Sequence, residues 1–134
     1  MAKHHDGLIY TMVLMSAADS EMTDVELFTM GEMVRALPVF HDYDEATLPA
    51  TTAACAELLA EDDGLDRVID FIKGAVGTKL AETAYALACD VVAADGKANQ
   101  EELRLLEIIR HRLDLDRLIA AGIERGSRAR HMTG

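Results

Sequence analysis

The sequence predicts an all-α protein, a single domain over residues 1–134 with about seven helices and an internal pseudo-two-fold repeat of a helix pair. Three observations support this prediction. Apolar residues recur at helical spacing along most of the chain. Strand signals are nearly absent, because only 4% of the residues are aromatic and no alternating run is bounded by turn residues. A helix-turn-helix segment also occurs twice, 76 residues apart.

The first helix pair is expected at about 8–37. Apolar or small residues at 9, 12, 13 and 16 form one face of a helix over about 8–18, and residues 27, 30, 34 and 37 form one face of a helix over about 23–37. Pro38 ends the second helix, because proline lacks the amide hydrogen that a helix interior needs.

Two further helices are expected between the copies. Leu48, Cys55 and Leu58 mark a third helix, with Pro49 tolerated in its first turn. The Asp-Asp-Gly at 62–64 breaks the chain. A short fourth helix, with apolar residues at 65, 68, 69 and 72, is expected to end at the glycines at 74 and 77.

The second helix pair is expected at about 78–113. An alanine-rich fifth helix covers about 78–94, and a sixth follows Asn99 with apolar residues at 103, 106, 109 and 113. A seventh helix that contains Leu118, Ile119 and Ile123 is expected after residues 114–116, and it is expected to fray near Gly126.

The repeated turn has the same polar pattern in both copies, at 17–27 and 93–103. Each copy places Ala-Ala-Asp at the end of an apolar stretch, a helix-capping residue four positions after the Asp, and a Glu three positions further on. These residues are Asp19, Thr23 and Glu26 in the first copy, and Asp95, Asn99 and Glu102 in the second.

Two interpretations fit these acidic turns. In the first, the Glu completes a capping box and the polar residues only satisfy backbone groups. In the second, the turns bind a cation, because Asp95 and Glu102 have the spacing of positions 5 and 12 of an EF-hand loop. Positions 1 and 3 would be Val91 and Ala93, which cannot be ligands, so an ion would need carboxylates from both copies or from elsewhere. Asp90, which interrupts an apolar helix, is the extra candidate ligand.

The net charge of −11 is unevenly distributed. Residues 19–70 hold 14 acidic residues against two basic ones, whereas residues 103–131 hold seven arginines against four acidic residues. The electrostatic field of such an acidic chain disfavours nucleic-acid binding, which needs a broad cationic surface. It favours the binding of cations or of basic partners. Alternatively, the surplus charge only keeps the protein in solution.

Two further expectations concern the cellular location of the protein and the redox state of its two cysteines. No stretch of 18 uncharged apolar residues occurs, and the start of the chain has no apolar leader, so we expect no membrane insertion and a cytoplasmic location. Cys55 and Cys89 lack C-x-x-C spacing. Reduced, buried thiols are therefore favoured over a disulfide.

Other polar clusters are weaker candidates. His4, His5 and Asp6 suit a soft metal, but adjacent histidines at a mobile terminus more often have no role. The His-Asp-Tyr-Asp at 41–44 is typical of a turn whose Asp residues bind their own backbone. No nucleophile-elbow or phosphate-loop motif is present, so nothing in the sequence indicates catalysis.

The second copy and the helix after it resemble the signature of the tellurite-resistance TerB family and of the related domain of a DnaJ-like membrane co-chaperone. The resemblance lies in CDVVAADGKANQEEL at 89–103 and in LDLD at 113–116, and the segment 17–26 resembles the N-terminal partner segment of that family. Ser20 replaces the turn glycine of the first copy, and Ala98 replaces a larger apolar residue in the second.

This resemblance implies a seven-helix fold with related helix pairs and a role in tellurite resistance and stress response, through metal-binding acidic residues and protein partners. The acidic residues of the family correspond here to Asp19, Glu26, Asp90, Asp95 and Glu102.

We therefore expect a non-enzymatic module that takes a divalent ion (Ca²⁺, Mn²⁺ or Zn²⁺), docks basic or membrane-associated proteins, or does both. The alternative is an enzyme that acts on a small molecule in a pocket between the two helix pairs.

Overall fold

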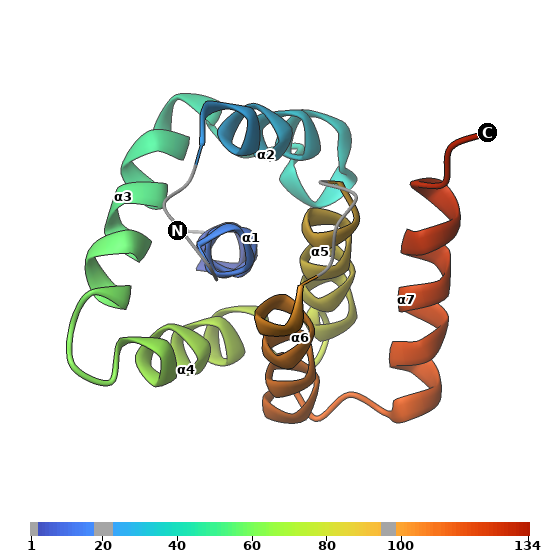
Figure 1. The fold of residues 1–134 in the computed structure, drawn as a ribbon. Coiled ribbons are helices and arrows are strands. Elements are labelled where there is room, and N and C mark those ends of the chain that lie inside the picture. The colour runs from blue at the N-terminus through green and yellow to red at the C-terminus, as the bar shows by residue number, and fades with distance from the viewer. Residues whose placement is uncertain (1–2, 18–22, 95–98) are drawn as a thin grey trace.

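A computed structural model describes residues 3–17, 23–94 and 99–134, and within these ranges the chain forms helices joined by turns and contains no strand. This confirms the predicted all-α class and its seven α-helices (Figure 1). The elements are α1 (Lys3–Ser16), α2 (Asp24–Ala36), the 3₁₀ turns η1 (Pro38–Phe40) and η2 (Glu45–Thr47), α3 (Leu48–Leu59), α4 (Gly64–Val76), α5 (Ala81–Ala94), α6 (Gln100–Arg112) and α7 (Arg117–Arg130). The structural equivalence of the two helix pairs stays a prediction.

Helix α1 lies at the centre of the domain. Figure 1 looks along its axis, with the other helices around it, and α3, α4 and α5 pack against it. The sequence predicted one buried face, yet Leu8, Leu14 and Met15 on its other sides are buried as well. A helix that is apolar all round is stable only when it is enclosed, so the other helices fold around α1.

The first turn of α1 is fixed to the η1 region by His5, whose ring is buried. Its Nε2 lies 2.9 Å from the Val39 carbonyl oxygen and 3.1 Å from Asp42 Oδ1. The ring also stacks on Phe40, with centroids 5.6 Å apart. The expectation that His5 belongs to a mobile terminus without a role is therefore wrong, and α1 begins at Lys3 rather than at about residue 8.

Helix α4 approaches α1 closely at Gly7. A Cβ atom added at Gly7 would lie 2.8 Å from the Ala75 Cβ and 3.1 Å from the Val76 Cγ1. The missing side chain therefore allows the two helices to pack. Helix α4 itself passes through Gly74 and ends at Gly77, whose φ of 62° is left-handed.

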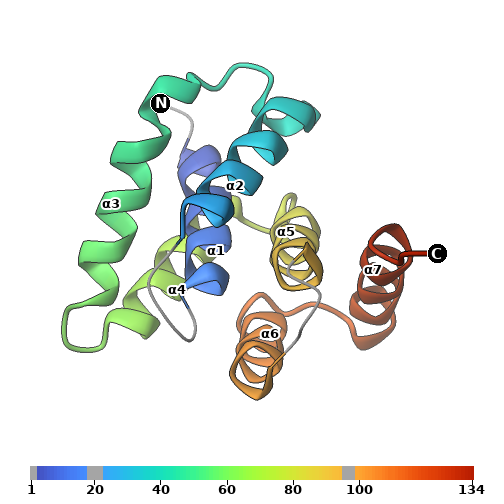
Figure 2. The same ribbon diagram turned by 45° about the horizontal axis from the view of Figure 1, so that its top comes forward.

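Helix α7 packs on α5, on the side away from α3 and α4 (Figure 2). Asp90 Oδ1 on α5 accepts hydrogen bonds from Ser127 Oγ at 2.7 Å and from Arg130 Nη2 at 2.8 Å. These bonds hold the last turns of α7, so the predicted fraying near Gly126 is wrong. Two apolar residues of α7 face away from the core, because Leu118 is 81% exposed and Ile119 is 42% exposed.

Within the described ranges no helix combines the length and the apolar character that crossing a bilayer requires. One apolar core joins residues from α1 to α7, so the helices form a single domain.

Replacing Gly7 by Ala tests the close approach of α1 and α4. We expect the free energy of unfolding to fall by about 1–3 kcal/mol, because the new methyl group overlaps Ala75. The matched control is Gly74→Ala on α4, where an added Cβ meets nothing within 4 Å. This control should be neutral or stabilising by roughly 0.5–1 kcal/mol. Urea denaturation measures both, and equal midpoints for the two variants would contradict the packing described.

The two cysteines provide a second test. Both are buried and free, as predicted, and burial raises the pKa of each thiol from 9.0 to about 12. We expect neither to react with a thiol reagent at about pH 8 in the native protein and both to react after denaturation. Because the unfolded thiols lose protons first, the free energy of unfolding should fall as the pH rises from about 9 towards 12. Rapid native modification of either thiol would contradict the burial.

Candidate functional site

Each acidic turn ends in a capping box. In the first, the Glu26 amide donates to Thr23 Oγ1 at 3.2 Å and the Thr23 amide donates to Glu26 Oε1 at 2.8 Å. In the second, the Glu102 amide donates to Asn99 Oδ1 at 2.8 Å and the Asn99 amide donates to Glu102 Oε1 at 3.2 Å. The predicted caps of α2 and α6 are thus confirmed, and the Glu of each box is held in a fixed position.

A cavity of about 70 Å³ lies where the ends of α1 and α5 meet the start of α2. Ser16 at the end of α1, Glu26 at the start of α2, and Val91 and Ala94 at the end of α5 all line it. The helices that lead into both turns therefore converge at one place. A water molecule occupies about 30 Å³ in the liquid, so this cavity has room for an ion and its water but not for an organic substrate.

Ser16 contributes an unsatisfied polar atom to this cavity. Its side chain is buried, and its hydroxyl oxygen has no hydrogen-bond partner in the described part of the chain. Leaving a buried hydroxyl without a partner costs about 1–3 kcal/mol. The cavity is therefore a place where an additional oxygen or cation would stabilise the protein.

The predicted metal ligands are distributed as follows. Asp19 and Asp95 lie outside the described residues. Glu26 lines the cavity, the buried Glu102 caps α6, and Asp90 binds α7 through Ser127 and Arg130. Among the residues that the structure describes, no three His, Cys, Asp or Glu side chains are grouped to hold a metal ion. A complete ion site here would need Asp19 or Asp95.

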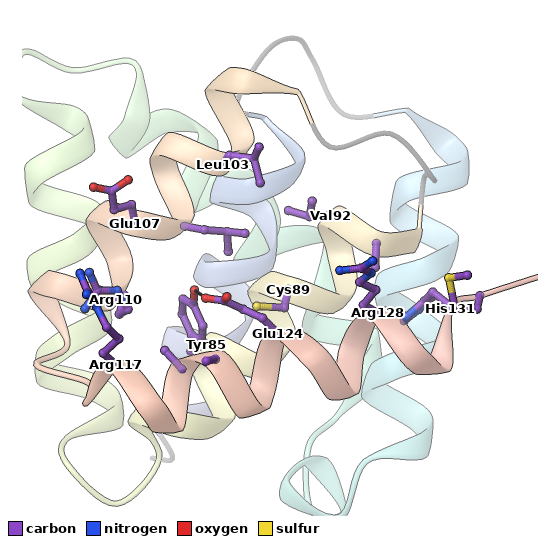
Figure 3. A pocket seen from close by; sticks show the side chains of 15 residues that line it. Tyr85, Cys89, Val92, Leu103, Glu107, Arg110, Arg117, Glu124, Arg128 and His131 are labelled. Atoms are coloured by element: carbon purple, nitrogen blue, oxygen red, sulfur yellow. Dashed lines mark hydrogen bonds between the residues drawn. The ribbon is translucent and has the colours of Figure 1, made fainter.

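A larger groove of about 730 Å³ lies between α6 and α7 (Figure 3). Helix α5 forms its floor, with Tyr85, Cys89 and Val92. The walls are Leu103, Leu106, Glu107 and Arg110 of α6 and Arg117, Ala120, Ala121, Glu124 and Arg128 of α7, and His131 and Met132 lie at one end. The α7 residues share one face because they recur at three- and four-residue intervals.

The centre of this groove holds two protonated groups. The Tyr85 hydroxyl donates to Glu124 Oε2 at 2.5 Å, and burial together with this bond raises the pKa of Tyr85. Burial, followed by the charge of Glu124, raises the pKa of Cys89 to about 12. An activated thiolate requires a lowered pKa, so Cys89 lacks the environment of a nucleophile.

A second groove, of about 840 Å³, lies between α2 and α3. It is lined by apolar side chains that include Leu27, Phe28, Leu48 and Pro49. Phe28 is 63% exposed. Arg35, the one basic residue among the described residues of the lining, forms an ion pair with Glu45, so its charge is neutralised within the groove.

Elsewhere in the described chain, several arginine and lysine side chains form ion pairs with carboxylates. Arg112 of α6 donates to Asp66 at 3.0 Å and to Asp70 at 2.5 Å on α4, and Lys73 lies 3.3 Å from Asp114. These pairs connect the acidic and basic halves. In contrast, no carboxylate of the described residues lies within ion-pair distance of the three groove arginines, at 110, 117 and 128.

The sequence identified the basic end of the chain but not this groove. The signal in the sequence that could have found it is the recurrence of Arg117, Glu124 and Arg128 on one face of α7.

Comparison of the chain with protein-family models, with curated proteins and with solved structures gives no match.

Replacing the capping residues tests the local structure of both turns. Thr23→Ala and Asn99→Ala should each lower the free energy of unfolding by about 1 kcal/mol, because a helix amide loses its acceptor. Thr29→Ala on α2 is the control, since its hydroxyl only bonds the Val25 carbonyl oxygen within the helix and its loss should be close to neutral. Wild-type denaturation midpoints for both cap variants would contradict their role.

Proposed function

We propose that this protein is a non-enzymatic TerB-like module, active in tellurite resistance and stress response, that binds a divalent cation between its two acidic turns and acts through partner proteins. The observation that supports this proposal most is the cavity that Ser16 and Glu26 line at the end of α5. The resemblance of residues 89–103 and 17–26 to the TerB signature supports it independently.

The chemistry of the cavity suits a hard cation. Glu26 supplies a carboxylate whose Oε1 is held by the Thr23 amide, and the Ser16 hydroxyl lacks a partner in the described chain. An ion at this place, with its bound water, would satisfy that hydroxyl. Asp19 and Asp95, one from each turn, are the further ligands that the repeat provides.

The candidate ligands are all oxygen atoms, and this favours some divalent metals over others. Calcium and manganese prefer carboxylate, carbonyl and water oxygens, whereas protein zinc sites are built mainly from cysteine and histidine. We therefore favour Ca²⁺ or Mn²⁺ over Zn²⁺. Asp90 is the least suited of the five candidate ligands, because its Oδ1 already accepts two hydrogen bonds from α7.

Two observations favour a binding module over the alternative of a small-molecule enzyme. The cavity between the helix pairs has a volume of about 70 Å³, which is far below the 300–1,000 Å³ that ligand pockets typically have. Tyr85 and Cys89, in the groove between α6 and α7, have raised pKa values and keep their protons at neutral pH. The acidic segment at 19–70 supports the docking of a basic partner, including one at a membrane.

Thermal denaturation of chelator-treated protein tests the cation site. Millimolar Ca²⁺ or Mn²⁺ should raise the melting temperature of the wild type, because an ion that binds only the folded state adds about 2.7 kcal/mol at a concentration of roughly 100 times its Kd. Glu26→Gln should abolish this rise, since it keeps the shape and the capping oxygen but removes the charge.

Glu32→Gln is the matched control, because Glu32 is an exposed residue of the same helix that does not line the cavity. It should keep the full cation response. A wild-type melting temperature that does not change when Ca²⁺, Mn²⁺ or Zn²⁺ is added would refute the proposed ion site. Equal changes in melting temperature for Glu26→Gln and Glu32→Gln would refute it as well.

A further inference from the structure

The groove between α6 and α7 is long enough to hold a further short helix. Both helices pack on α5, but within the described chain they make few contacts with each other. Figures 1 and 2 show the two helices apart from one another, and residues of both line the groove. The residues from Arg117 to Arg128 line one wall. At 1.5 Å per residue these residues span about 16 Å, or three helical turns.

Apolar side chains line the groove on its floor and on both walls, on either side of the Tyr85–Glu124 hydrogen bond. Val92 on the floor, Leu106 on one wall and Ala120 on the other present hydrocarbon, and Leu103 is 49% exposed at the edge. The two small alanines of α7 leave room for the side chains of an occupant. An amphipathic helix would bury its apolar face here, with anchors at three- and four-residue intervals.

The ends of the groove are cationic. Arg110 and Arg117 lie at one end, and Arg128 and His131 lie at the other (Figure 3). The lining contains three arginines and two glutamates, in a chain whose net charge is −11. One of these glutamates, Glu124, accepts the Tyr85 hydroxyl. Because no described carboxylate forms an ion pair with these arginines, the groove favours an occupant with anionic groups at both ends.

The length of the groove, its apolar lining and its cationic ends together indicate what kind of molecule binds there. A flat membrane surface does not reach the floor of a concave groove, and a small amphiphile with one anionic head group would neutralise only one end. We infer that the groove docks an acidic amphipathic helix of a partner protein, about three turns long, with apolar residues on one face and Asp or Glu near both ends. This surface extends the proposed function by a partner class and is separate from the cation site.

Binding of synthetic peptides tests this inference. The probes are helical peptides of about 14 residues with leucines on one face and glutamates beside them, and matched peptides in which lysine replaces glutamate. Fluorescence anisotropy should show that the wild type binds the acidic peptides, that it binds the lysine peptides at least about tenfold more weakly, and that salt weakens the acidic complex.

Protein variants locate the binding surface. The triple variant R110Q/R117Q/R128Q should bind the acidic peptides at least about tenfold more weakly than the wild type. R104Q/R125Q is the matched control, because these exposed arginines of α6 and α7 lie outside the groove, and it should bind like the wild type. Ala121→Trp should block binding without a change of charge. Circular dichroism and melting temperature verify the fold of every variant.

Several outcomes would overturn the inference. These are failure of the acidic peptides to bind, equal binding of acidic and lysine peptides, and equal losses in R110Q/R117Q/R128Q and R104Q/R125Q. Saturation of the groove by decanoate, with no peptide binding, would instead make it a small-molecule site. The triple variant should keep its response to Ca²⁺ and Glu26→Gln should keep its affinity for the peptide, so failure of this inference is distinguishable from failure of the proposed cation site.

Discussion

The enclosure of α1 is the constraint on which the rest of the structure depends. This helix buries apolar side chains on every side, and only the combined surfaces of α3, α4 and α5 cover it. Gly7 permits the closest of these contacts, and His5 fixes the first turn. The same enclosure brings Ser16, at the end of α1, to the last turn of α5. The position of the candidate ion site is thus a consequence of core packing.

Features that a few neighbouring residues determine could be predicted from the sequence. The capping boxes of Thr23 with Glu26 and of Asn99 with Glu102 each lie within four residues, so their spacing alone specifies the hydrogen bonds. Contacts between distant segments could not be predicted in the same way. His5 meets a carbonyl 34 residues away, and Asp90 meets Ser127 and Arg130 across 37 and 40 residues. An Asp within an apolar helix did indicate a partner or exposure, and the half-buried Asp90 has its partners on α7.

The groove could not be predicted from the sequence for a related reason. Helical periodicity predicts that apolar residues of α7 face the core, but Leu118 is exposed, whereas Ala120 and Ala121 face the groove together with two arginines. The separation of α6 from α7 results from the way both pack on α5. The surplus negative charge of the chain is therefore combined with a groove whose three arginines form no ion pair with a described carboxylate. The two surfaces suit partners of opposite charge.

The central claim is that the two acidic turns form one cation site together, not one site each. Isothermal titration calorimetry of chelator-treated protein with Ca²⁺ or Mn²⁺ tests this claim most directly, because it counts ions per chain. Convergence of Ser16, Glu26 and Ala94 on a single cavity predicts one bound ion per chain and no saturable binding in Glu26→Gln. Two equivalent ions per chain, or no saturable heat in the wild type, would contradict it.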